Sequence, residues 1–371
     1  AIERQFAIIL GQADLTDIVA VEIVRIFERQ HRREGLGAID LPDQRNGFDP
    51  RGARHLGTVP QLVADDGIDA GTRAILAGFG IAPDALIGEG GTSLVFALEG
   101  NRVIRILRRR GDPAALRQLA GFLAMIDGRV ACPTPRIERV DPEGRFVIEG
   151  RLAGRALLRV LPGLAGVRRE RAFAAYARSA EAVATVTFPE RAFGQILAAA
   201  PLTAPTWRGY LRAALDRFAA RNAAVIAASA GDVEGLVARA RTLLDAVPEP
   251  RARFLVHGDY FPGNVLVDDS LSVTGLVDFS DWTVVGDPAL DIAGAALFLE
   301  MIDEATPGDV ARVRDIVFSR HGPAIVPAAR FYRAYAAFAV ADPEAGGGLY
   351  PKMFRWAVAT LKALGEGTIE A

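Results

Sequence analysis

The segment from Phe254 to Ala293 constrains the fold and the chemistry of this chain more than any other. It begins with a short apolar strand and continues into a polar loop. Two further apolar runs follow, and they are separated by the turn-forming residues Asp268, Asp269 and Ser270. Two short apolar runs around such a turn predict a β-hairpin.

The predicted hairpin brings polar residues together. If its turn is centred near Leu271, Asn264 lies opposite Asp278, and opposed residues on a hairpin are about 5 Å apart. An amide oxygen and a carboxylate at that separation can hold one hard cation, and Mg²⁺ prefers oxygen ligands while leaving room for phosphate oxygens. Asp259 lies on the polar loop, where it can accept a proton from a hydroxyl group near the metal. The segment therefore predicts a phosphoryl-transfer site.

The same residues resemble the catalytic core of the protein-kinase-like superfamily. HGD at 257–259 followed by Asn264 resembles the H-x-D-x-x-x-x-N loop, in the form typical of aminoglycoside phosphotransferases and related small-molecule kinases. VDF at 277–279 stands where kinases carry the metal-binding D-F-G, with Ser280 in place of the glycine. GDP at 286–288 with a following aspartate resembles the GDP-x-x-D-x-A motif of that branch. The competing interpretation is an acidic surface hairpin with a stray histidine.

The resemblance implies a role for each acidic residue. Asp259 would be the catalytic residue that orients and deprotonates the acceptor hydroxyl. Asn264 and Asp278 would bind Mg²⁺ on the phosphates of ATP or GTP, and Asp291 would brace the catalytic loop. His257 is interpreted as a structural residue of that loop.

Composition sets the remaining limits. At 371 residues the chain exceeds one average domain. Its formal net charge of −2 gives no reason to expect nucleic acid or an anionic membrane as a partner. The single cysteine, Cys132, excludes an intrachain disulfide, and we interpret it as a packed thiol. The chain lacks a signal-peptide pattern and a membrane-spanning run, so we expect a cytoplasmic protein.

Residues 1–80 do not match the family core and are interpreted as a partly helical N-terminal extension. One helix is predicted from Asp14 or Thr16 and a second over 69–79, with a Gly- and Pro-rich segment between them. His31 and His55 form no metal-binding motif with other residues of this segment, so we interpret both as surface residues. The extension could cap the smaller lobe, mediate a dimer or shape a substrate pocket; the oligomeric state is left open.

From Ala85 the pattern changes to strands. Residues 86–98 resemble the nucleotide-binding hairpin of kinases, where glycines allow backbone amides to approach phosphate oxygens. The resemblance assigns nucleotide binding to the loop residues Gly88, Gly90, Gly91, Thr92 and Ser93. Ser93 replaces the third glycine, and we predict that its hydroxyl contacts a phosphate.

The next strand carries the residue that replaces the kinase lysine. No lysine precedes Lys352, and alignment with the V-A-I-K pattern places Val103 against the base and Arg105 against the phosphates. The following helix, 112–126, contains no glutamate, so we expect an Arg105–Gln118 hydrogen bond in place of the usual Lys–Glu pair. Glu149, at the end of a later strand, resembles the hinge residue whose backbone binds the base.

The predicted fold is α+β, a bilobal protein-kinase-like architecture. A five-stranded antiparallel N-lobe spans 81–150, and a mainly helical C-lobe with the catalytic and acceptor sites spans 151–371. The apolar periodicity predicts C-lobe helices over 168–187, 206–228, 233–246, 291–302, 309–320, 327–340 and 349–364.

The acceptor is not fixed by these motifs. Glu300, Asp303 and Glu304 form an acidic cluster that could bind an amine-bearing sugar, or else a solvated helix end. Aminoglycosides, macrolides, homoserine, choline and sugars all fit. The alternative function is a catalytically silent nucleotide-binding or scaffold protein, which the altered Lys–Glu pair favours.

Overall fold

The computed structural model describes residues 68–342 and 351–371. The helix predicted from Asp14 or Thr16, the Gly- and Pro-rich segment, and both His31 and His55 lie outside the described residues.

The second predicted helix is present as α3 (Ala70–Gly78). It begins there because the Asp69 carboxylate accepts a hydrogen bond from the backbone N–H of Thr72 at 2.8 Å, as an N-cap residue does. A 3₁₀ turn (Pro83–Ala85) then leads into the sheet.

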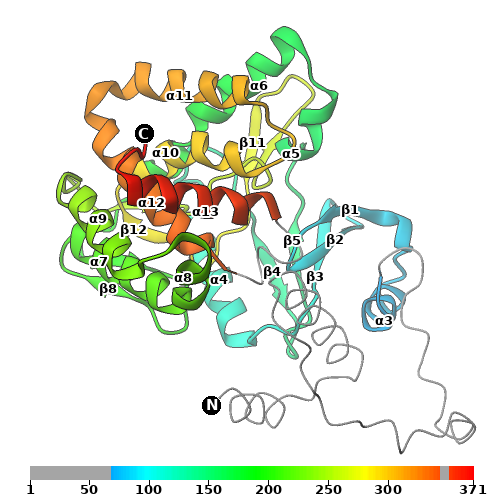
Figure 1. The fold of residues 1–371 in the computed structure, drawn as a ribbon. Helices are drawn as coiled ribbons and strands as arrows, with labels where there is room; N and C mark the ends of the chain where they lie inside the picture. The colour runs from blue at the N-terminus through cyan, green and yellow to red at the C-terminus, as the bar shows by residue number, and fades with distance from the viewer. Residues whose placement is uncertain (1–67, 343–350) are drawn as a thin grey trace, which may run out of the picture. The chain divides into compact units, whose positions relative to one another are not determined.

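Five antiparallel strands form the sheet of the smaller lobe, as the sequence predicts, in the order β1-β2-β3-β5-β4. Figure 1 shows these strands lying together beside α3. Their bounds are β1 (Leu86–Glu89), β2 (Ser93–Leu98), β3 (Arg102–Leu107), β4 (Ile137–Val140) and β5 (Phe146–Gly150).

The two faces of this sheet differ. One face packs on α3 through an apolar cluster that includes Leu76, Phe96 and Ile104. Residues 68–79 therefore pack as part of the smaller lobe. Alternation along the strands turns Val103 and Arg105 to the opposite face, because successive side chains point to opposite sides. Helix α4 (Pro113–Ile126) follows β3.

The helical lobe follows the predicted periodicity with three differences. The helix predicted over 291–302 ends at Leu297, and a 3₁₀ helix (Phe298–Met301) follows it. The helix predicted over 168–187 ends at Ser179. The helix predicted over 206–228 is two helices, because Asn222 leaves helical geometry and its side chain donates to the carbonyl of Phe338 at 2.8 Å. The helices are α5 (Leu157–Val160), α6 (Gly166–Ser179), α7 (Trp207–Arg221), α8 (Ala223–Ala230), α9 (Val233–Asp245), α10 (Ala289–Leu297), α11 (Pro307–His321), α12 (Val326–Val340) and α13 (Pro351–Glu366).

Two small sheets hold the catalytic segment within this lobe. One has the order β11-β10-β6 and the other β8-β7-β12-β9. Their strands are β6 (Arg155–Ala156), β7 (Phe193–Gln195), β8 (Thr203–Ala204), β9 (Phe254–Val256), β10 (Val265–Val267), β11 (Val273–Leu276) and β12 (Val284–Gly286).

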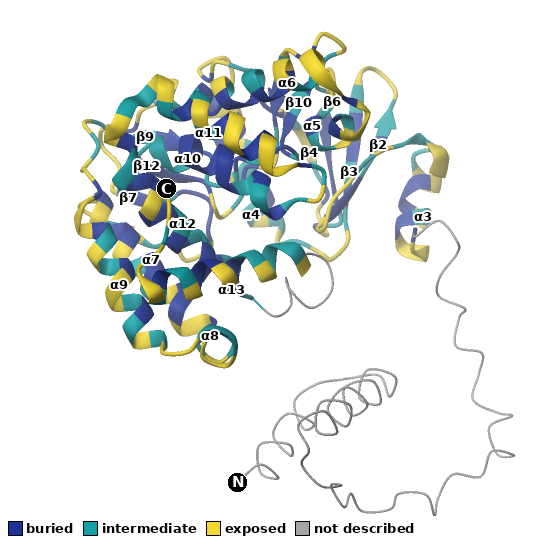
Figure 2. Ribbon diagram, turned by 45° about the horizontal axis from the view of Figure 1, so that its top comes forward, coloured by how far each residue is buried: buried dark blue, intermediate teal, exposed yellow. Residues whose placement is uncertain are grey.

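Helix α10 forms the centre of the helical lobe. Its residues from Asp291 to Leu297 are all buried, and it packs against both α11 and α12. Figure 2 shows the buried positions of these helices gathered in the interior, with their exposed positions turned outward. None of the helices in the described parts of the chain is long and apolar enough to cross a membrane.

Candidate active site

The predicted catalytic loop leaves β9 at His257. Gly258 has a φ of +81°, and a Cβ atom there would lie 1.9 Å from the backbone carbonyl oxygen of Trp282. Only glycine accepts both the positive φ and this close approach. The loop is therefore pressed against the segment that leads into β12.

Asp291 braces this loop, as the resemblance implies. Its carboxylate accepts hydrogen bonds from the backbone N–H groups of His257 at 2.7 Å and Gly258 at 2.8 Å. Hydrogen bonds to a carboxylate are among the strong ones. Burial nevertheless raises the pKa of Asp291 to about 7, and the two N–H donors oppose that shift.

His257 links the loop to the hairpin. Its Nε2 lies 2.9 Å from the carbonyl of Val277 and so carries the proton, while Nδ1 accepts from the backbone N–H of Asp259 at 3.3 Å. The ring is fully buried against Phe279, and burial lowers its pKa to about 4. His257 is therefore neutral and holds the loop in register with the residue before Asp278.

Asp259 lies partly buried beside Asn264. The Asn264 Nδ2 atom donates to the carbonyl of Asp259 at 2.9 Å and to its Oδ2 at 3.1 Å. Burial raises the pKa of Asp259 to about 7, the negative charge of Asp278 adds to the shift, and the bond from Asn264 opposes it. A carboxyl group poised in this way is suited to accept a proton near neutral pH.

The predicted pairing of Asn264 with Asp278 is wrong by one residue. The backbone N–H of Val277 donates to the Asn264 carbonyl at 2.9 Å, so Val277 lies opposite Asn264. The turn is centred one residue earlier than predicted, and the register shifts at Leu266/Val267. A shift of one residue normally turns a side chain to the other face.

Asp278 departs from regular strand geometry. Its φ is +67°, in the left-handed region that non-glycine residues rarely adopt. Such strained positions concentrate at functional sites. Asp278 is an exposed residue, but neighbouring protein atoms partly desolvate its carboxylate. Its pKa is raised by this desolvation, and the positive charge of Arg105 opposes the shift.

The donor set suits a hard cation. Because Asn264 uses Nδ2 for both of its side-chain hydrogen bonds, its Oδ1 could bind a cation, and the carboxylate of Asp278 could be a second ligand. Among residues 68–342 and 351–371, no three His, Cys, Asp or Glu side chains form a metal-binding group. Such a set leaves room for phosphate oxygens, as Mg²⁺ at a nucleotide site requires.

The predicted nucleotide-binding hairpin is formed by β1 and β2. Gly88 lies in β1, Gly90, Gly91 and Thr92 form the exposed turn, and Ser93 is the buried first residue of β2. The backbone N–H of Gly90 donates to the carbonyl of Ser93 at 2.9 Å and closes the turn.

The predicted Arg105–Gln118 hydrogen bond is wrong. Arg105 donates from Nε and Nη2 to Oε1 of Glu149 at 2.9 and 2.6 Å. Gln118 instead donates from Nε2 to the backbone carbonyl of Ile196 in the helical lobe at 3.0 Å. The arginine is paired within its own sheet, because Glu149 on β5 lies diagonally across from it.

Of the three acidic residues that the sequence groups as an amine site or a solvated helix end, Glu300 is already paired with other side chains. The carboxylate of Glu300 receives hydrogen bonds from Arg333, from Arg314 at 3.1 Å and from the indole N–H of Trp356 at 2.9 Å. These partners lower the pKa of Glu300 against the effect of its burial. Glu300 is thus a neutralised structural residue.

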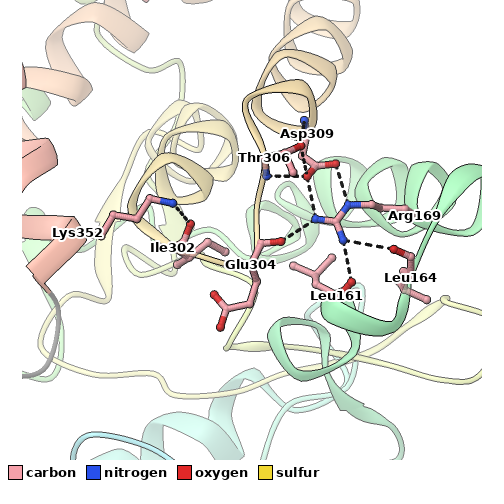
Figure 3. A network of polar contacts seen from close by, with 8 residues as sticks. All are labelled: Leu161, Leu164, Arg169, Ile302, Glu304, Thr306, Asp309 and Lys352. Carbon is pink, nitrogen blue, oxygen red and sulfur yellow. Dashed lines mark hydrogen bonds and ion pairs between the residues drawn. The ribbon is translucent and has the colours of Figure 1, made fainter.

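The neighbouring acidic residues serve other contacts. Lys352 lies 3.6 Å from the exposed Asp303 carboxylate and donates to the carbonyl of Ile302. Figure 3 shows Arg169 bonded to the carbonyl oxygen of Glu304 and to the carboxylate of Asp309, while the Glu304 carboxylate points away from it.

Sequence reasoning missed two aromatic features of the site. Tyr260, next to the catalytic aspartate, is buried and stacked on Tyr176 with ring centroids 5.1 Å apart. Trp282 is 39% exposed although it touches the catalytic loop, and its ring packs on Phe218. Apolar residues at 172–177 indicated a buried stripe, but nothing in the sequence pairs this stripe with the loop.

Two features lie apart from the site. Cys132 packs against the core, and burial raises the pKa of its thiol to about 11, as expected for a packed thiol. Cavities of about 390 and 510 Å³ lie around Arg253, and no predicted site residue lines them.

A five-stranded sheet over a helical lobe, with a braced HGD loop beside an asparagine and a second aspartate, defines a kinase-like phosphotransferase. The comparisons with known proteins agree. The model of the phosphotransferase enzyme family matches residues 85–344, well over half of the chain. The chain belongs to the phosphotransferase enzyme family, and it is a phosphotransferase with an alcohol group as acceptor.

Solved structures show the same fold. Macrolide 2'-phosphotransferase type I is 19% identical, with a TM-score of 0.50 over 79% of this chain and 98% of that one. The gentamicin–APH(2")-IIa complex is 14% identical, with a TM-score of 0.50 over 81% and 99%. Macrolide 2'-phosphotransferase MphH from Brachybacterium faecium is 18% identical, with a TM-score of 0.47 over 78% and 95%. No functionally curated protein sequence matches the chain significantly.

Proposed function

We propose that this protein transfers the γ-phosphate of ATP or GTP to a hydroxyl group of a small hydroxylated molecule. The observation that carries the proposal is the contact of Asn264 with Asp259 beside the charge of Asp278. This arrangement supports a proton acceptor at Asp259 beside two residues, Asn264 and Asp278, whose oxygen atoms would bind a cation.

Each residue has a defined part in the proposed reaction. Asp259 orients the acceptor hydroxyl and takes its proton, and a pKa of about 7 leaves a large fraction of it ionised at neutral pH. Asn264 and Asp278 would hold Mg²⁺, which when bound neutralises charge on the phosphates. Arg105 binds the nonreacting phosphates.

The proposed acceptor has an apolar face, as a macrolide does. The neutralised Glu300 removes one of the three negative charges with which an amine-bearing acceptor could have paired. Trp282 offers an exposed aromatic surface beside the catalytic loop, suited to an apolar face. The structural similarity to macrolide 2'-phosphotransferase type I suggests macrolides as the first acceptors to test.

The experiment is phosphate transfer from γ-labelled ATP and, separately, GTP, with Mg²⁺, to macrolides, aminoglycosides, amino alcohols and sugars. Asp259→Asn is the control. Transfer to a macrolide or another apolar acceptor that disappears in the control supports the proposal. Nucleotide binding without transfer to any acceptor would favour the catalytically silent protein instead, and transfer to aminoglycosides alone would contradict the apolar acceptor.

A further inference from the structure

The Arg105–Glu149 pair is well shielded from solvent. The two side chains are 19% and 10% exposed, and the single acceptor Oε1 receives both arginine donors. The attraction within a shielded, doubly hydrogen-bonded ion pair is stronger than in an exposed one, because water screens it less.

Strand register explains why these two residues meet. Arg105 lies directly opposite Val147, and Val103 lies opposite Glu149. All four side chains therefore belong to one face of the sheet, and Arg105 and Glu149 are diagonal neighbours. Long side chains can bridge that diagonal of about 7–8 Å. This is the face turned away from the apolar cluster on α3.

The helix that follows β3 has a different anchor. Gln118 of α4 donates to Ile196 in the helical lobe, and α4 contains no carboxylate. Arg105 is therefore positioned by Glu149 and not by a side chain of α4.

Arg105 keeps donors for a second partner. A guanidinium has more N–H groups than the two that Glu149 occupies, and they lie in a fixed plane. The pair thus holds the remaining donors on the face of the sheet that is turned away from the apolar cluster on α3.

We propose that Glu149 is the positioning residue for Arg105. The guanidinium group that binds the nonreacting phosphates is then held by a residue of its own sheet and not by a residue of α4. This inference rests on the proposed function. It predicts that the side chain of Glu149 matters for binding the phosphates of the nucleotide and not for binding its base.

Binding of ATP with Mg²⁺ and of adenosine, measured by calorimetry, tests this, with GTP and guanosine as a second pair. Glu149→Gln should weaken binding of the triphosphate by about tenfold, as loss of a hydrogen-bonded charged partner does, and leave nucleoside binding within about twofold. Glu149→Asp, which keeps the charge, should recover part of the loss. The double variant Arg105→Gln, Glu149→Gln should bind the triphosphate no more weakly than Arg105→Gln alone. Glu149 acts through Arg105, so its loss has no further effect once Arg105 is replaced.

Gln118→Ala is the matched control and should keep the wild-type ratio of triphosphate to nucleoside affinity. Wild-type triphosphate binding by Glu149→Gln overturns the inference. A parallel loss of nucleoside binding also overturns it, because it indicates a base contact or general damage. If the wild-type protein itself binds neither ATP nor GTP, the proposed function fails, and that result is distinct from failure of the inference alone.

Discussion

The hydroxyl of Tyr176 donates to the backbone carbonyl of Tyr260 at 3.0 Å, and the hydroxyl of Tyr260 donates to the carbonyl of Tyr176 at 2.8 Å. Both side chains are buried. These reciprocal bonds connect α6 to the residue that follows Asp259. The core of the helical lobe therefore holds the backbone of the predicted catalytic loop in place.

Removing one hydroxyl should affect both stability and turnover. Tyr176→Phe leaves the buried carbonyl of Tyr260 unsatisfied and should lower the free energy of unfolding by about 1–3 kcal/mol, measured by urea denaturation. It should also lower kcat, because Tyr260 adjoins Asp259. Tyr332→Phe, which loses a buried bond from the Trp207 indole N–H, should lower stability but leave kcat unchanged. Equal kcat values for both variants would contradict the role in loop placement.

The sequence predicted those features that depend on local pattern. The resemblance to kinases predicted the five strands, and the helix that Asp69 caps was predicted within a residue of α3. The HGD loop and Asp291 were recognised because their spacing is short and their residue types are constrained by chemistry. Each of these follows from neighbours within a few residues.

Contacts between distant segments were not predictable in this way. Asn264 was paired with Asp278 because the irregularity at Leu266/Val267 leaves no mark in the pattern of residues. Arg105 was paired with Gln118 because strand register, which brings Glu149 near, depends on the whole sheet. The ion pairs of Glu300 were not predicted, because its partners lie 14, 33 and 56 residues away in the sequence.

Asp259 and Asp278 should separate turnover from nucleotide binding. Asp259→Asn removes the proton acceptor and should lower kcat by about 10²–10⁴-fold, with Mg²⁺-nucleotide binding retained. Asp278→Asn should weaken Mg²⁺-nucleotide binding, because it removes a ligand and a negative charge. Steady-state kinetics and calorimetry on both variants measure the difference. Mild and equal effects would exclude these assignments.

Glu300 should matter for stability and not for acceptor charge. Glu300→Gln leaves the half-buried Arg333 without its carboxylate, and breaking such a pair costs about 3–5 kcal/mol when it is fully buried. We expect a smaller loss here, because these side chains retain 13–19% exposure. Thermal unfolding measures it. The KM for amine-bearing and neutral acceptors should change by the same factor; a selective rise for the amine-bearing acceptor would restore the amine-binding role.

The buried aspartates should make stability fall as the pH rises. Burial raises the pKa of Asp259 and of Asp291 to about 7, whereas unfolded aspartates titrate near about 4. Between these values the folded state binds more protons than the unfolded state, so the free energy of unfolding decreases with increasing pH. Their contribution to stability is fully present below pH about 4 and declines up to about pH 7.

Asp259→Asn removes one such group. Its curve of unfolding free energy against pH should be shallower by up to about 1.4 kcal/mol per pH unit, and at pH 7.5 the inactive variant should be more stable than the wild type. Asp269→Asn, at a side chain that is 99% exposed, is the control and should follow the wild-type curve. Urea denaturation from pH 4.5 to 8 measures the slopes. Parallel curves for Asp259→Asn and the wild type would show that the Asp259 carboxyl is ionised at the same pH in both the folded and the unfolded state.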